Sequence, residues 1–202
     1  MRTYRTVNLS VLWFLIALNV VIFIITLLRP EILYFLGLTP ALLSKQPWTI
    51  ISSMFVHGNF WHILFNMIAL YFLGSFLIRA AGEKSFLAVF FLGGLAGNAL
   101  YFLFGHLVLH GLLPPSFGDP FIPGIGASGG IFALGGALAV VVPRVPVIII
   151  PIPVPIPLWV AILIFFLLSF LPGIAWQAHV GGLLLGLVAG LIFRRRRRIY
   201  YF

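Results

Sequence analysis

Six apolar stretches, separated by polar or proline-rich segments of very different length, make up about half of this 202-residue chain. They lie near residues 10–28, 61–78, 85–105, 128–142, 157–171 and 177–193. The longer ones approach the length of about 20 residues that an α-helix needs to cross a bilayer, and several are shorter. The pattern predicts an all-α polytopic membrane protein with six transmembrane helices, which form one membrane domain over residues 1–202.

The segments between these stretches predict two long outer loops and one inner loop. Residues 29–60 contain too many breaks for a span and are expected to form short amphipathic pieces in the interface. Residues 106–127 form the second outer loop, in which His106 and His110 are expected as interfacial residues without a catalytic role. Residues 143–157 alternate proline with valine and isoleucine toward their end, which predicts an extended inner loop.

Composition and charge exclude an ordinary soluble domain. Hydrophobic residues account for 62% of the chain, which has only three acidic residues and a net charge of +9. Five of the twelve basic residues form the run Arg194 to Arg198 directly after an apolar stretch, which is typical of a headgroup anchor and argues against a nucleic-acid partner. The positive-inside rule then places both termini in the cytoplasm, and we expect the bilayer to be the cell membrane of a prokaryote.

Three polar residues on three different apolar stretches predict a catalytic site. Asn66, Ser128 and His179 each lie 13 to 16 residues before an arginine that is expected to mark the inner end of the helix. At 1.5 Å rise per residue, all three lie roughly 20–24 Å above that end. A serine, an imidazole and an amide donor at one depth are the groups that a nucleophilic hydrolase uses.

Ser128 is the candidate nucleophile because of where its helix begins. About fifteen apolar residues cover only some 22 Å, so this helix is expected to start inside the membrane with Ser128 in its first turn, where backbone N–H groups are unpaired. A lone serine in a membrane helix more often serves close helix packing. Here the glycines that follow it, beginning with Gly129, already supply that small surface.

His179 is the candidate general base. Gly182 follows it by three residues and Gly186 by a further four, and together they form a smooth stripe on nearly the same face. This stripe would let the helix approach the glycine-rich helix after Ser128 closely. The imidazole would then come within hydrogen-bond range of the serine. The alternative is a histidine that bonds to a backbone carbonyl or reaches the outer surface.

His62 and Asn66 lie four residues apart on one helix and therefore face the same direction. The Asn66 amide could donate to an oxyanion, or it could serve as a hydrogen-bond link between helices. No acidic residue lies in any span, which excludes an aspartyl dyad and an aspartate as third member of a triad. Neither a His-Glu-x-x-His motif nor a cysteine is present, so we expect no metal, no cofactor and no disulfide.

Taken together, these motifs resemble those of the rhomboid intramembrane serine proteases. The matching stretches are Pro47-Trp48 through Ser53-Met54-Phe55-Val56-His57, His62-x-x-x-Asn66, Gly126-Ala127-Ser128-Gly129 and Ala178-His179-x-x-Gly182-x-x-x-Gly186. The resemblance implies Ser128 as nucleophile and His179 as general base. It also implies an oxyanion hole formed by Asn66, His62 and the Ser128 amide, with His57 supporting the outer loop. Gly126, Gly129, Gly182 and Gly186 are assigned to close helix packing.

The function implied by the resemblance is cleavage of transmembrane segments of other membrane proteins by a Ser-His dyad, without a cofactor. Substrate would enter laterally between the second and fifth spans, past Phe65 and Trp159. One alternative is a catalytically inactive rhomboid-like protein that binds membrane segments. Another is a small-solute transporter, which would predict repeats and discontinuous helices in both halves. Neither the substrate nor the oligomeric state follows from the sequence.

Overall fold

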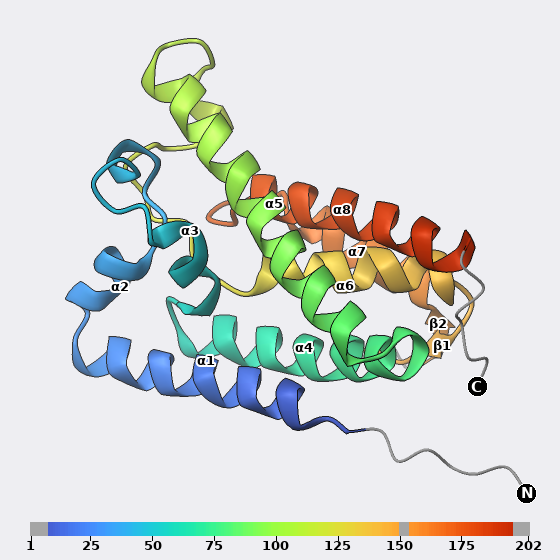
Figure 1. Ribbon diagram of the computed structural model, residues 1–202. Coiled ribbons are helices and arrows are strands. Elements are labelled where there is room, and N and C mark those ends of the chain that lie inside the picture. Colours follow the sequence, from blue (N-terminus) through green and yellow to red (C-terminus); the bar gives the residue numbers. More distant parts are fainter. Residues whose placement is uncertain (1–7, 150–153, 196–202) are drawn as a thin grey trace, which may run out of the picture.

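The computed structural model describes residues 8–149 and 154–195, and this part of the chain is mainly helical (Figure 1). The longer helices are α1 (Ser10–Leu28), α4 (Phe60–Ala81), α5 (Glu83–Leu109), α6 (Ser128–Val141), α7 (Leu158–Leu168) and α8 (Trp176–Arg195). The short ones are α2 (Glu31–Leu36), η1 (Pro40–Leu42), α3 (Thr49–Ser52), η2 (Ser53–Phe55) and η3 (Pro115–Phe117). The predicted all-α membrane fold is confirmed.

Within the described residues, four helices are long and apolar enough to cross a bilayer. These are α1, α4, α5 and α8, with 19, 22, 27 and 20 residues. Helices α6 and α7 have 14 and 11 residues. At 1.5 Å per residue even α6 is only about 21 Å long, so each is shorter than the hydrocarbon core of about 30 Å. The structure is consistent with six spans, and the count of six stays a prediction.

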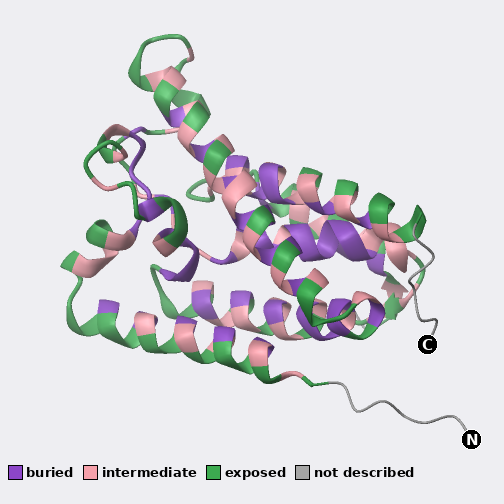
Figure 2. Ribbon diagram, viewed as in Figure 1, coloured by how far each residue is buried: buried purple, intermediate pink, exposed green. Residues whose placement is uncertain are grey.

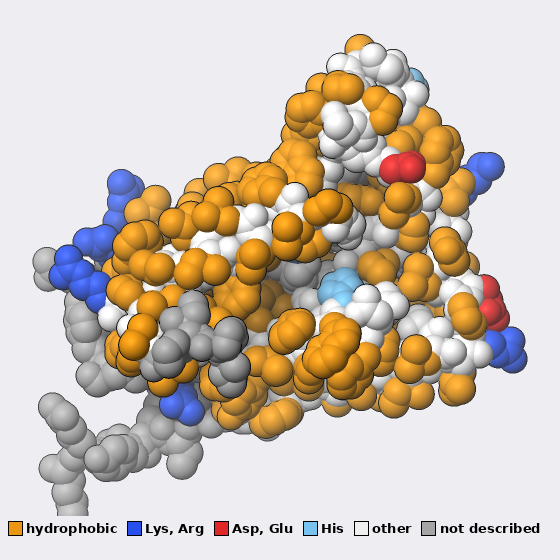
Figure 3. All heavy atoms as spheres, turned by 180° about the vertical axis from the view of Figure 1, so that it is seen from behind, with side chains coloured by type: hydrophobic (Ala, Val, Ile, Leu, Met, Phe, Trp, Pro, Cys, Tyr) orange, Lys and Arg blue, Asp and Glu red, His pale blue; other side chains and the backbone are white. Residues whose placement is uncertain are grey.

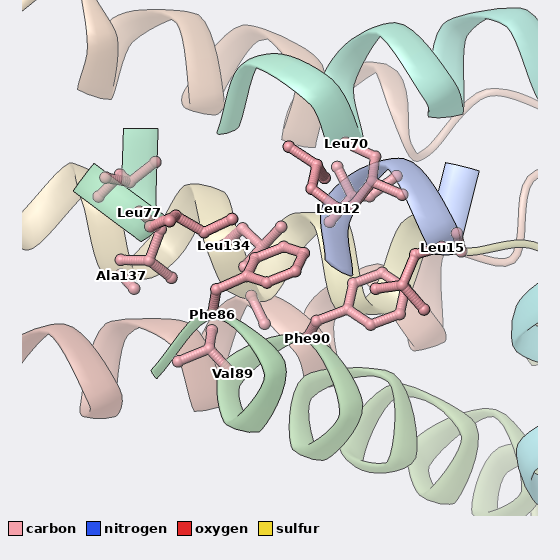
Figure 4. Packing of buried hydrophobic residues seen from close by; sticks show 14 of the residues in the cluster. Leu12, Leu15, Leu70, Leu77, Phe86, Val89, Phe90, Leu134 and Ala137 are labelled. Atoms are coloured by element: carbon pink, nitrogen blue, oxygen red, sulfur yellow. The ribbon is translucent and has the colours of Figure 1, made fainter. Parts of the chain in front are cut away.

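The short helix α6 lies at the centre of the molecule. It packs against α4, α5, α7 and α8, and most of its residues are buried (Figure 2). A cluster of large apolar side chains fills the space between α1, α4, α5 and α6; it includes Leu12, Leu70, Leu77, Phe86, Phe90 and Leu134 (Figure 4). Because its neighbours cover it, α6 can begin and end inside the membrane without exposing its backbone to lipid.

Close packing of α8 on α6 depends on glycines, which have no side chain to keep the two helices apart. A Cβ added at Gly182 would overlap the backbone carbonyl of Gly129, and one at Gly186 would overlap that of Ala133. A Cβ at Gly190 would lie 2.7 Å from the Ala137 carbonyl oxygen. Helix α8 therefore lies against the α6 backbone along a stripe of small residues.

The segments outside the long helices differ in part from the prediction. Residues 29–60 form four short helices, as predicted, and their placement in the interface stays a prediction. His106 lies in the last turn of α5, so its placement in a loop was wrong, whereas His110 follows the helix as its C-cap and begins the loop. The apolar residues 107–109 continue the helix, which ends before Gly111 at φ +70°.

The connection between α6 and α7 begins with a turn at residues 143–144 and continues in two short extended strands where the structure describes it. Strands β1 (Pro146–Val147) and β2 (Ile156–Pro157) pair in antiparallel orientation. Pro151 and Pro153, on which the extended prediction partly rests, lie outside the described residues. The paired strands lead directly into α7, which begins at Leu158.

Candidate active site

Ser128 is the first residue of α6, and the loop before it is held by backbone hydrogen bonds. Gly124 and Leu38 exchange two such bonds of 2.8 and 2.9 Å, and the Gly126 N–H donates to the Ser53 carbonyl at 2.9 Å. Gly126 has φ +120°, which a residue with a side chain rarely adopts. These bonds to Leu38 and Ser53 thus fix the position of the loop that leads into Ser128.

Ser128 and His179 are hydrogen-bonded to each other. The Ser128 Oγ lies 2.8 Å from Nε2 of His179, which joins α6 to α8. Phe132, one turn after Ser128, stacks on the imidazole with ring centroids 4.4 Å apart and planes at 28°. His179 is buried. The structure therefore brings together a hydroxyl and an imidazole with the geometry that activation of a serine nucleophile requires.

A second serine completes a chain of three hydrogen-bonded side chains. The other ring nitrogen of His179, Nδ1, lies 2.7 Å from the Oγ of Ser169. Ser169 directly follows α7, and its hydroxyl also bonds to the Phe165 carbonyl at 3.2 Å. Neither Ser169 nor Phe132 was predicted from the sequence. The four-residue spacing from Ser128 was an available signal for Phe132, whereas no pattern marked Ser169.

His62 and Ser128 flank the same backbone position. A Cβ built at Gly126 would lie 2.7 Å from Nε2 of His62 and 3.5 Å from the Ser128 Oγ. Asn66 follows one turn later, and its amide donates to the His62 carbonyl at 2.8 Å. No hydrogen bond joins Asn66 to Ser128 or His179, and its Oδ1 is buried without a partner among the described residues. One N–H of the Asn66 amide thus bonds within α4, and the second N–H has no hydrogen-bond partner among the described residues.

His57 lies behind His62 in the interior. The two rings meet edge to face with centroids 4.9 Å apart. His57 is only 1% exposed, and neither ring nitrogen has a hydrogen-bond partner in the part of the chain that the structure describes. Burial, with a smaller contribution from the charge of His62, lowers the pKa of His57 from 6.5 to about 3. His57 is therefore neutral at physiological pH.

A small hollow of about 10 Å³ lies beside Ser128. Its lining includes Asn98, Gly129 and Ala178. This volume is close to the minimum for one water molecule, and polar groups in the wall would hold it there. Seen from behind, histidine atoms are visible in the middle of an otherwise hydrophobic face (Figure 3). Within residues 8–149 and 154–195, no group of three or more His, Cys, Asp or Glu side chains is placed to hold a metal ion.

The two residues predicted to gate substrate entry lie on different helices, both facing outward. Phe65 on α4 is 62% exposed and stacks on Trp61 with centroids 6.0 Å apart. Trp159 on α7 is 48% exposed. Helix α7 packs mainly on α6 and on the β1–β2 pair, so its outer face is covered little by the rest of the described chain. A gate at these residues stays a prediction.

Comparison with known proteins finds one family and several relatives. Residues 44–196 match the Rhomboid domain. The chain is 28% identical to "Rhomboid protein 1, mitochondrial" of Saccharomyces cerevisiae over 156 residues. This alignment covers 70% of this chain and 40% of the relative. It is 29% identical to "RHOMBOID-like protein 5" of Arabidopsis thaliana over 77% of this chain and 47% of the relative. "Rhomboid-like protease 3" of Toxoplasma gondii is 30% identical over 32% of this chain and 24% of the relative. The chain spans less than half the length of each of these relatives.

Proposed function

Because the chain belongs to the rhomboid family, we propose that it is an intramembrane serine endopeptidase that cleaves transmembrane segments of other proteins. The observation that carries this proposal is the 2.8 Å hydrogen bond between the Ser128 Oγ and Nε2 of His179. Ser128 of this pair is the first residue of α6, which is too short to cross the membrane and is covered by the helices around it. Such a position suits hydrolysis of a peptide bond inside or next to the bilayer.

The first step is attack of Ser128 on the scissile carbonyl. A new bond forms between Oγ and the carbonyl carbon, and the hydroxyl proton passes to Nε2 of His179. The carbonyl oxygen becomes an oxyanion. Stacking on Phe132 holds the imidazole in the plane that this transfer needs.

The oxyanion is stabilised by donors from two helices. The backbone N–H of Ser128 belongs to the first turn of α6, where N–H groups have no partner within the helix. Asn66 contributes the amide N–H that is not used on the His62 carbonyl, and His62 approaches Ser128 from across Gly126. A single donor of this kind typically contributes about 3–4 kcal/mol to lowering the barrier.

Collapse of this intermediate breaks the peptide bond. The proton on Nε2 of His179 passes to the leaving amine, and the acyl group stays on Ser128. Water then repeats the sequence in place of Ser128, with His179 again as base, and releases the second product. The hollow beside Ser128 supplies a place for this water.

The substrate and its route follow from the same proposal. We expect a transmembrane segment to enter laterally between α4 and α7, past Phe65 and Trp159. We also propose that both termini lie in the cytoplasm, because arginines such as Arg79 and Arg144 lie at the span ends that the positive-inside rule assigns to that side. Residues 1–7 and 196–202, which carry further arginines, lie outside the described residues.

The proposal is tested with purified protein in liposomes and a panel of reporters, each with one transmembrane segment. We expect the wild-type protein to cut at least one reporter within or next to that segment, as located by mass spectrometry. Ser128→Ala and His179→Ala should abolish cleavage. Ser75→Ala is the control, because Ser75 is also buried but bonds only to the carbonyl of Phe72 on its own helix. If the wild-type protein binds reporters but cuts none, it is an inactive relative and the proposal is wrong.

A further inference from the structure

We propose that Ser169 is the positioning residue of the catalytic base: it fixes the proton on Nδ1 of His179 and links the dyad to α7. This inference rests on the proposed function for its kinetic consequence, whereas its structural part concerns the tautomer of His179 alone. Three observations carry it. They are the 2.7 Å contact between Nδ1 and the Ser169 Oγ, the bond from Ser169 to Phe165, and the burial of both side chains.

The assignment of the proton follows from counting donors. A serine hydroxyl has one hydrogen, and we assign that of Ser169 to the Phe165 carbonyl 3.2 Å away, which can only accept. The bond between Ser169 and His179 must then use the Nδ1–H as donor and the Ser169 oxygen as acceptor. A neutral imidazole with its proton on Nδ1 has a bare Nε2. That bare nitrogen accepts the hydroxyl of Ser128.

The tautomer decides whether His179 can act as a base. With the proton on Nε2 instead, the ring would donate to Ser128 and could not remove its proton. In serine proteases of the triad type a buried aspartate fixes this choice, and loss of the correct tautomer slows catalysis by about 10⁴-fold. This chain has no acidic residue within hydrogen-bond range of His179 in its described part, and Ser169 takes that position. An uncharged acceptor is weaker, so its loss should have a smaller effect.

The position of Ser169 ties the base to α7. Ser169 directly follows this helix and lies ten residues before His179, so the bond spans the short connection between α7 and α8. Helix α7 rests on α6 through Ile162, which fills the space over Gly135. Phe166 on α7 also meets Phe132 edge to face at 6.4 Å. An outward movement of α7 would therefore move the Ser169 oxygen away from Nδ1 of His179. The proton of His179 is then fixed on Nδ1 only while α7 packs against α6.

The first test measures the tautomer directly and needs no activity. In ¹⁵N-histidine-labelled protein near neutral pH, the ring nitrogens of His179 are assigned by their loss in His179→Gln. We expect a protonated Nδ1 and a bare Nε2 in the wild-type protein. In Ser169→Ala, signal should shift toward the form protonated on Nε2. A wild-type His179 protonated on Nε2 would overturn the inference, even if the protein is an active protease.

The second test separates positioning from a general structural role. Ser169→Ala should lower kcat on a cleaved reporter by about 10–100-fold with KM within about twofold, because a buried donor loses its partner while the substrate contacts remain. Ser169→Thr keeps the hydroxyl and should restore most of kcat. Ser75→Ala, which removes a buried serine with only a bond to its own helix, should leave kcat unchanged. Equal kcat for wild-type and Ser169→Ala would overturn the inference, and so would a loss that Ser169→Thr does not recover.

Discussion

A single methyl group added at Gly182 should disable the site without changing a reacting atom. Gly182 lies one turn after His179, and a Cβ there would overlap the carbonyl oxygen of Gly129, which is backbone and cannot rotate away. The same Cβ would lie 2.8 Å from the Gly129 carbonyl carbon. Non-bonded carbon atoms need about 3.5–4.0 Å between them, so we expect the two helices to separate by on the order of 1 Å. The 2.8 Å bond between Ser128 and His179 joins these same helices and would lengthen with them.

The expected loss in kcat/KM for Gly182→Ala is about 100-fold, the effect that a misplacement of about 1 Å can have on catalysis. Gly190→Ala adds the same methyl group farther along α8, where it would lie 2.7 Å from the Ala137 carbonyl oxygen, and should have a smaller effect. Val188→Leu enlarges an exposed residue of α8 and should have none. Thermal unfolding in detergent separates loss of the site from loss of the fold. Activity of Gly182→Ala within about twofold of wild type would refute the reasoning.

Three further predictions concern Asn66, His57 and the proposed gate between α4 and α7. Asn66→Ala should lower kcat by about 10²–10³-fold as the loss of one oxyanion donor, and an unchanged kcat would leave Asn66 with a structural role only. Because burial lowers the pKa of His57 from 6.5 to about 3, the unfolded state binds more protons below pH 6.5. The contribution of His57 to the free energy of unfolding should then be complete above pH 6.5 and fall by up to about 1.4 kcal/mol for each pH unit below it. His57→Phe should make thermal melting depend less on pH. Identical pH dependence of the wild-type protein and His57→Phe would contradict this prediction. Trp159→Ala or Phe65→Ala should speed cleavage, and a disulfide engineered between α4 and α7 should block it until reduced; equal rates before and after reduction would point to another entry route.

The long helices were predictable because apolar length is what the bilayer selects. Each of the six predicted stretches agrees with its helix to within a few residues, as for 128–142 and the observed Ser128–Val141. The C-terminal end of α5 was predicted a few residues too early. The sequence there is apolar with histidines, and only the positive φ of Gly111 shows where the helix stops.

The candidate site was predictable where its members follow a helical repeat. His62 and Asn66, and the glycines after His179, are spaced at intervals that put them on one face of a helix. Ser169 follows no such repeat. Its contact with His179 depends on how the connection from residue 169 to residue 176 folds back, and this is a matter of tertiary packing rather than of sequence pattern.

The central claim is that Ser128 is a nucleophile activated by His179, and labelling with a fluorophosphonate tests it most directly. The reagent forms a covalent bond only with an activated serine hydroxyl, and mass spectrometry of the digested protein locates the adduct. We predict a single adduct on Ser128 in the wild-type protein, which disappears in His179→Ala although Ser128 is still present, and which persists in Ser75→Ala. An adduct on another residue, or one on Ser128 that forms equally fast without His179, would contradict the account.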